Sequence, residues 1–269
     1  MSRSLPLEPF IRQRLALRAA RGDAPILLMS HLVLGYPSLD ENRRVIDAMA
    51  AAQVELMELQ IPFSEPIADG PVIAQANQIA LDRGFRVAQG LAFAAECAQR
   101  HPEVAFLIMT YGNILIAHGV ERFIRRAAEL GARGLIIPDW PPQEADLPMD
   151  LCRQQEGLDW IQLFTPTSTD ARLNEIGQWG RGFCYCVARK GVTGSRTDFD
   201  GELSRFLARC RRATGVPLAV GFGVRSPEDI RSLTGQAEIA VVGTAALEIH
   251  LREGAEAVGR FFESLRPTT

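Results

Sequence analysis

The chain has 269 residues, of which 47% are apolar and 23% are charged, a composition typical of a globular protein that fits one domain. Its formal net charge of −3 gives no electrostatic footprint for nucleic acid, and no apolar run approaches the roughly 18 residues of a membrane span. We therefore expect a protein that binds neither nucleic acid nor membrane. No signal peptide is evident, and the odd number of cysteines includes no C-x-x-C pair, so we expect reduced thiols in the cytoplasm.

Residues 7–21 predict an amphipathic helix that plugs or covers one end of the fold. Eight short apolar runs follow it, and each run is succeeded by a loop and a helical pattern. Continuous apolarity is typical of strands that are buried on both faces of a parallel sheet. The predicted strands cover residues 26–34, 54–62, 105–111, 134–139, 159–166, 182–189, 217–223 and 239–245.

Eight strand–helix units predict an α/β fold, a (β/α)8 TIM barrel formed by residues 1–269 as a single domain. An extra helix is predicted at 71–83, between the second and third strands. The alternative is a doubly wound open sheet, which usually has fewer strands and a glycine-rich turn after the first one; here that turn is LGYPS. The helices of the repeating units are predicted at 39–52, 87–100, 119–131, 142–156, 169–178, 200–214, 226–234 and 246–265.

The segment MELQIPFSEPIADGP, residues 57–71, places Glu58 near the end of the second strand and Asp69 in the loop after it. The active site of a barrel lies at the C-terminal ends of its strands. Leu56, Glu58 and Gln60 share one strand face, and if that face looks into the barrel, Glu58 is a nearly buried acid suited to giving and taking protons. The alternatives are a structural glutamate paired with an arginine, and a turn or helix cap at Asp69.

Three glycine-rich segments follow later strands: RKGVTG at 189–194, GFG at 221–223 and VGTA at 242–245. Backbone amides in such segments can approach an anion, and Thr244 adds a hydroxyl, so together they predict a phosphate site, with ordinary tight turns as the alternative. The only lysine, Lys190, lies in a loop, which argues against a Schiff-base mechanism. The four histidines lack metal-ligand spacing, so we expect no metal site.

Six segments fall in the order and spacing of the tryptophan synthase alpha chain family: LGYPS, MELQIPFSEPIADGPVIAQAN, MTYGN, ARKGVTG, VGFGVRSPEDI and VVGTA. The sequence resembles that family over residues 8–265. The resemblance implies a lyase that splits indole-3-glycerol phosphate into indole and glyceraldehyde 3-phosphate by a retro-aldol reaction, without cofactor or metal. It also implies a partner, the pyridoxal-phosphate beta chain, in an α2β2 tryptophan synthase.

The resemblance also implies roles for individual residues. Glu58 matches the catalytic glutamate of the family, and Asp69 matches the catalytic aspartate that accepts a hydrogen bond from the indole N–H. Tyr185 matches a tyrosine close to that glutamate. Tyr111 and Asn113 match positions that line the pocket or order the loop after the second strand. The positions that match the phosphate cradle, with the phenylalanine between two of them, are Gly194, Phe222, Gly223, Gly243 and Thr244.

Four positions depart from the family pattern. Gln60 stands where the family has glycine, and Val33 stands where it has threonine. His31 replaces an aromatic residue, and Trp140 replaces a small aliphatic one. These departures leave an alternative open: a stand-alone paralogue in secondary metabolism that releases free indole or acts on a modified indole.

Overall fold

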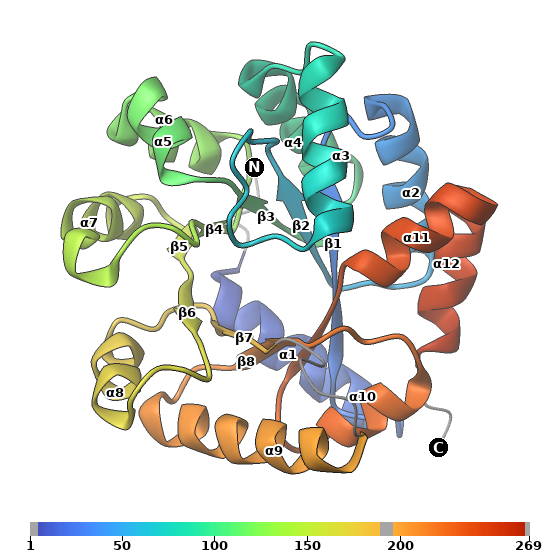
Figure 1. The fold of residues 1–269 in the computed structure, drawn as a ribbon, viewed down its shortest axis with the longest axis vertical. Coiled ribbons are helices and arrows are strands. Elements are labelled where there is room, and N and C mark those ends of the chain that lie inside the picture. Colours follow the sequence, from blue (N-terminus) through green and yellow to red (C-terminus); the bar gives the residue numbers. More distant parts are fainter. Residues whose placement is uncertain (1–4, 189–195, 267–269) are drawn as a thin grey trace.

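A computed structural model describes residues 5–188 and 196–266 of the chain, with the backbone alone for 196–200. Within these ranges, nine parallel strands form one sheet in the order β5-β4-β3-β2-β1-β9-β8-β7-β6. Figure 1 shows the strands at the centre of the molecule with the helices arranged around them. The strands are β1 (Leu27–Val33), β2 (Leu56–Gln60), β3 (Ala105–Met109), β4 (Gly134–Ile136), β5 (Asp159–Trp160), β6 (Gln162–Phe164), β7 (Cys184–Val187), β8 (Leu218–Gly221) and β9 (Ile239–Val242).

The two end strands of this sheet, β5 and β6, are consecutive in the chain and together form the one strand predicted at 159–166. Strand β5 pairs with β4, whereas β6 pairs with β7. Ile161 joins them: its N–H donates to Leu135 O at 2.9 Å, and its side chain lies in the barrel core. The sheet therefore closes on itself, and the predicted (β/α)8 barrel is confirmed.

The helices follow the predicted order with three local differences. The helix predicted at 246–265 is two helices, because Gly254 separates them with φ of +83°. A short helix at 112–118 was not predicted, and the segment 142–156 holds a 3₁₀ turn before its helix. The helices are α1 (Leu7–Ala20), α2 (Leu39–Ala51), α3 (Pro71–Asp82), α4 (Val87–Arg100), α5 (Gly112–His118), α6 (Val120–Glu129), η1 (Pro142–Glu144), α7 (Asp146–Gln154), α8 (Asp170–Gln178), α9 (Arg196–Ala213), α10 (Pro227–Leu233), α11 (Thr244–Glu253) and α12 (Ala255–Ser264).

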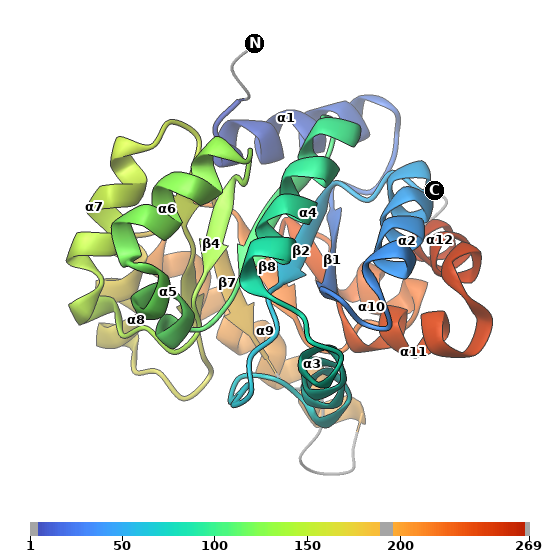
Figure 2. The ribbon, with the colours of Figure 1, turned by 90° about the horizontal axis from the view of Figure 1, so that it is seen from above.

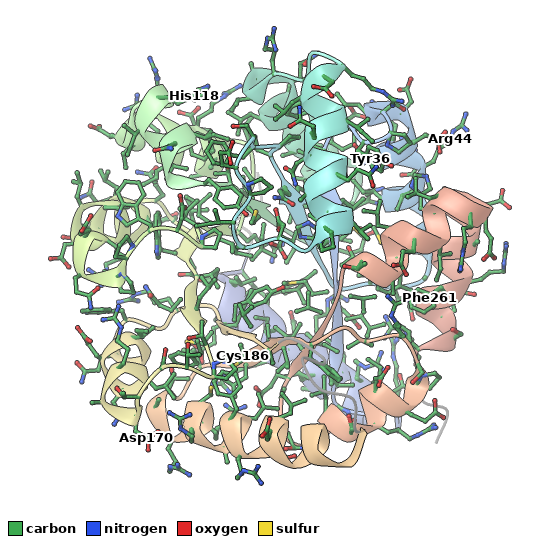
Figure 3. All side chains as sticks on the ribbon, in the orientation of Figure 1. Tyr36, Arg44, His118, Asp170, Cys186 and Phe261 are labelled. Atoms are coloured by element: carbon green, nitrogen blue, oxygen red, sulfur yellow. The ribbon has the colours of Figure 1, made fainter. Side chains whose placement is uncertain are left out.

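The apolar core has two layers, one inside the barrel and one between the strands and the helices. Side chains fill both spaces, and Cys186 on β7 lies near the middle of the molecule (Figure 3). Along β2, Leu56 belongs to the inner layer, whereas Met57 and Leu59 belong to the outer one. Because successive strand residues point to opposite faces, Glu58 and Gln60 face the barrel interior, as predicted.

Helix α1 closes the end of the barrel where the strands begin, and α3 lies at the opposite end (Figure 2). Leu7, Phe10 and Ile11 of α1 are buried in the inner core layer together with residues of the strands. The first helix therefore plugs the barrel rather than only covering it. The other end, where the strands finish, is left for the side chains of β2 and the loops.

Replacing Ile11 by alanine tests this plug. Ile11 has no exposed surface, so Ile11→Ala leaves a cavity in the barrel core and is expected to lower the free energy of unfolding by about 2–5 kcal/mol. Chemical denaturation monitored by circular dichroism measures the change. The matched control is Leu17→Ala on the same helix, where the side chain is 44% exposed and the expected change is within about 0.5 kcal/mol. Equal effects of the two substitutions would contradict the plug.

Candidate active site

A cavity of about 190 Å³ lies at the end of the barrel where the strands finish. Both predicted acids border it, and so do residues from the glycine-rich segments. A larger cavity of about 640 Å³ lies near α7 and the start of β5, and no predicted site residue lines it. The smaller cavity is therefore the candidate site. Its lining is His31, Glu58, Ala68, Asp69, Gly70, Ile73, Met109, Ile136, Pro138, Leu163, Tyr185, Val187, Gly221, Gly223, Val241, Gly243 and Thr244.

Glu58 is a buried acid that pairs with no arginine or lysine among the described residues. It is 3% exposed, and its Oε2 has no hydrogen-bond partner among the described residues. Glu55, three residues earlier, is the acid that pairs with arginines: Arg266 at 3.2 Å and Arg18 at 3.5 Å. The ionisable neighbour of Oε2 is His31, whose Nδ1 lies 3.4 Å away, and Oε2 can exchange a proton with a ligand in the cavity.

Asp69 is fixed by side chains and does not cap a helix. The N-cap of α3 is Gly70, which has no side-chain cap, so the cap that was the alternative for Asp69 is not formed. Instead Oδ2 of Asp69 accepts from Gln60 Nε2 at 2.6 Å, Tyr111 Oη at 3.2 Å and Asn77 Nδ2 at 3.4 Å. Three donors on one oxygen hold the Asp69 carboxyl group in place beside the cavity.

Tyr111 orders the loop after β2 rather than lining the cavity. Its side chain is fully buried and stacks on Phe63, with ring centroids 5.0 Å apart. Its hydroxyl donates to Asp69 and accepts the N–H of Ala68 at 3.2 Å. Burial and then the charge of Asp69 raise the pKa of Tyr111 far above its usual value, so the hydroxyl stays a donor. Asn113, the other residue matched to this role, is exposed on α5.

Removing the hydroxyl of Tyr111 is expected to loosen Asp69. Tyr111→Phe removes one donor to the carboxylate and the acceptor for Ala68 N–H, so we expect kcat/KM to fall about 5–10-fold, the equivalent of one to two net hydrogen bonds. Steady-state kinetics with indole-3-glycerol phosphate measures this change. Tyr36→Phe is the control, since Tyr36 does not line the cavity. An unchanged rate in Tyr111→Phe would show that the other two donors suffice.

Tyr185 lies across the cavity from Glu58, on β7. Burial and then the charges of Glu58 and Asp69 raise the pKa of Tyr185 well above its usual value, so it is a neutral phenol. A Cβ atom on Gly221 would lie 3.1 Å from its hydroxyl oxygen, so glycine leaves the space that the ring occupies. Tyr185 can therefore donate a hydrogen bond toward the acids or a bound ligand.

The glycine-rich side of the cavity has the geometry of an anion site. Gly243 is the N-cap of α11, and Thr244 begins that helix; both border the cavity. The first N–H groups of a helix have no partner within it, and the helix dipole favours an anion there. Gly223 borders the same space with φ of +84°, which favours glycine. The cavity therefore has acids on one side and backbone donors on the other.

Two further residues were matched to the phosphate cradle, Phe222 and Gly194. Phe222 is 3% exposed, and its side chain packs in the outer core layer, so only its backbone can face an anion. Gly194 lies outside the described residues, as does Lys190. A side chain that points away from the barrel axis could be anticipated at Phe222 from alternation with its neighbours.

Sequence reasoning missed several residues of the site. Asn77, on α3, donates to Asp69 and accepts the N–H of Phe63 at 3.0 Å, so it fastens the loop to the helix. Its position in the motif VIAQAN was the signal in the sequence that could have identified it.

Of the four departures from the family pattern, His31 borders the cavity and Gln60 is fully buried beside it. Trp140 packs edge-on against Trp160, with ring centroids 5.9 Å apart, and does not line the cavity.

Comparison with known proteins identifies the family of this chain. The family model described as tryptophan synthase alpha chain matches residues 17–262. A tryptophan synthase alpha chain from Syntrophotalea carbinolica is 47% identical over 260 residues, which cover 97% of this chain and 100% of the relative. The chain belongs to the tryptophan synthase alpha chain family. The alpha chains are lyases that cleave indole-3-glycerol phosphate, and the main function implied by the resemblance is the one these comparisons support.

Solved structures agree with the tryptophan synthase alpha fold. A tryptophan synthase structure from Mycobacterium tuberculosis superposes with a TM-score of 0.84 at 30% identity, covering 96% of each chain. A tryptophan synthase complex from Pyrococcus furiosus superposes with a TM-score of 0.80 at 30% identity, covering 89% of this chain and 97% of that one. Among the helices of the described residues, none has the length and apolarity needed to cross a bilayer.

Proposed function

We propose that this chain cleaves indole-3-glycerol phosphate into indole and glyceraldehyde 3-phosphate, with Glu58 and Asp69 as catalytic acids, as the alpha subunit of a tryptophan synthase. The observation that carries the proposal is that both acids border one cavity with Gly223, Gly243 and Thr244. A substrate with a flat heterocycle and an anionic tail needs both the acids, which contact the ring, and the backbone donors, which bind the anion.

Glu58 is the proton carrier in this proposal. Indole carbon 3 must be protonated before it can act as a leaving group, and the glycerol hydroxyl on the adjoining carbon must lose its proton as the carbon–carbon bond breaks. One carboxyl group can give the first proton and take the second, so no net proton is consumed. The buried carboxyl group of Glu58, which borders the cavity, suits both steps.

Asp69 stabilises the charge that develops on the ring. When carbon 3 is protonated, the indole becomes an indolenine cation with its positive charge at the nitrogen. Because Gln60, Tyr111 and Asn77 all donate to Oδ2, Oδ1 is the oxygen expected to accept the indole N–H. An ionised acceptor held before the reaction begins binds the cation more tightly than the neutral substrate, which is how it lowers the barrier.

The phosphate is bound at the other side of the cavity. Backbone N–H groups at the N-terminus of α11 and the Thr244 hydroxyl are expected to hold it, together with the backbone near Gly223. Gly194 lies outside the described residues, and it is proposed for the same cradle on the resemblance alone. No cofactor is required for this chemistry, because each step is a proton transfer or a bond cleavage with an acceptor at hand.

A tryptophan synthase beta chain is the proposed partner, and the cytoplasm is the proposed compartment. Two exposed apolar side chains lie at the cavity end of the barrel: Ile67, 75% exposed in the loop after β2, and Ile116, 63% exposed on α5 after β3. We propose these two side chains as contacts for the partner. Such a partner would receive indole directly from the cavity.

The deciding experiment is a lyase assay with indole-3-glycerol phosphate, run with and without a tryptophan synthase beta chain. Turnover that rises strongly on addition of the beta chain supports the alpha-subunit function. Brisk turnover by the isolated chain, unchanged by the beta chain, favours the stand-alone paralogue that releases free indole. Absence of cleavage under both conditions would refute the proposed reaction.

A further inference from the structure

His31 and Gln60 form a connected path between the two acids. Gln60 Nε2 donates to Asp69 Oδ2 at 2.6 Å, and Gln60 Oε1 lies 2.8 Å from His31 Nε2. His31 Nδ1 lies 3.4 Å from Glu58 Oε2. The two middle members of this path come from paired strands, His31 from β1 and Gln60 from β2.

The hydrogen-bond roles along the path follow from what each group can do. An ionised carboxylate only accepts, so Asp69 must receive the NH₂ group of Gln60. The carbonyl oxygen of Gln60 then faces His31 and accepts from Nε2, which must carry a proton. Nδ1 is left as the nitrogen that gains or loses a proton, and it is the nitrogen that faces Glu58.

We propose that His31 is a positioning residue that stores the proton used by Glu58, with Gln60 holding its ring in the required orientation and tautomer. The inference rests on the proposed function, since it takes Glu58 as the acid–base group. In the resting site, an imidazolium Nδ1–H faces the ionised carboxylate of Glu58. Transfer breaks this N–H bond and forms an O–H bond on Oε2, which leaves both groups neutral.

The proton count balances over the cycle. Glu58 passes the proton to indole carbon 3 and becomes a carboxylate again. It then takes the glycerol hydroxyl proton as the carbon–carbon bond breaks, and the electron pair of that bond returns to the ring. The new proton passes from Oε2 back to Nδ1 of His31. Glu58 and His31 therefore share one proton before and after each turnover.

Burial and the surrounding charges support a proton on this pair at neutral pH. The side chains of His31 and Glu58 are 9% and 4% exposed. Burial is the largest influence and by itself lowers the pKa of His31, but the charges of Glu58 and Asp69 and the contact with Gln60 together outweigh it. The pKa of His31 therefore lies above its ordinary 6.5. Among the described residues that border the cavity, the remaining titratable group is the neutral phenol of Tyr185.

The sign of the pH dependence follows. The stored proton is present below the raised pKa of His31 and is lost as the pH rises through it, so kcat falls at high pH. In His31→Asn, only the carboxyl can hold the proton, and carboxyl groups release protons at lower pH than imidazolium does. We expect the descending limb of the kcat profile to move down by about one pH unit, which reduces kcat at pH 8 about 10-fold.

The matched control is His101→Asn, because His101 lies just before β3 at the opposite end of the barrel, where it contacts Asp47 at 2.8 Å. Its pH profile should equal that of the unchanged protein. A descending limb that stays in place in His31→Asn would overturn the inference, because a merely structural histidine changes the height of the profile but not its position.

A second measurement does not depend on turnover or on the folding of the His31 variant. In nitrogen-15 NMR of the unchanged protein, His31 should titrate above pH 6.5 with Nε2 protonated at high pH, and Glu58→Gln should lower that midpoint. A midpoint that is below 6.5 or insensitive to Glu58→Gln would refute the stored proton. If the unchanged protein cleaves no substrate, the proposed function fails, whereas this titration still decides the inference.

Discussion

Glu58→Gln is expected to reduce kcat by about 10²–10⁴-fold and to leave KM nearly unchanged. Glutamine has the same shape as glutamate and fits the same buried position, so substrate binding should survive. It cannot give a proton to indole carbon 3 or take one from the glycerol hydroxyl, so both steps lose their carrier. A fall in kcat without a change in KM is the signature of an interaction made only in the transition state.

The measurement is steady-state cleavage of indole-3-glycerol phosphate, with substrate binding to the variant measured separately by calorimetry. Glu65→Gln is the matched control, because Glu65 is an exposed acid in the loop after the same strand. It should keep full activity. Retained turnover in Glu58→Gln would mean that another group carries the proton, and binding lost together with turnover would point to a structural role.

Asp69→Asn is expected to reduce kcat by about 100-fold or more, the scale found when one preorganised charge-stabilising group is removed. The three donors on Oδ2 make this substitution more damaging than its size suggests. They require an acceptor, so asparagine must turn its carbonyl oxygen toward them. Its NH₂ group then replaces Oδ1 and faces the indole N–H, donor against donor. The variant therefore loses both the charge and the acceptor.

Steady-state kinetics of indole-3-glycerol phosphate cleavage checks this prediction. The decrease should appear mainly in kcat, because the positive charge on the ring develops during the reaction. Asp82→Asn is the control, since Asp82 is exposed on α3 and accepts only from Gln78 at 2.7 Å in the described contacts. If Asp69→Asn were as active as the control, the indole nitrogen would not be bound by Asp69.

These two predictions and the path through His31 concern one connected set of side chains: Glu58, His31, Gln60 and Asp69. Glu58 and Asp69 both lack an arginine or lysine at the cavity among the described residues, and the positive charge nearest to Glu58 is supplied by His31. A histidine can release its charge during turnover, whereas an arginine cannot. This difference is the physical reason to expect a pH-dependent rate from this site.

Much of the fold could be predicted because its signals are local. Apolar runs marked every barrel strand, and alternation along β2 placed Glu58 on the inner face. Two helix boundaries could not be predicted from the sequence. The seven residues of α5 are too few to show a clear helical period. Gly254 ends α11 through its positive φ, although the apolar pattern continues across it. Ile161 divided one predicted strand because the closing sheet pairs its two halves with different neighbours.

By itself, the sequence determined the order of strands and helices, the acid at the end of β2, the glycines after later strands and the family. Only the tertiary structure decided that α1 plugs the barrel, that Asp69 receives three donors instead of capping α3, and that Gln60 and His31 join the two acids. The reason is that strand period and turn chemistry depend on neighbours in the chain. A hydrogen bond between β1 and β2, or between β2 and a loop, exists only once the closed sheet brings those segments within 3 Å of each other.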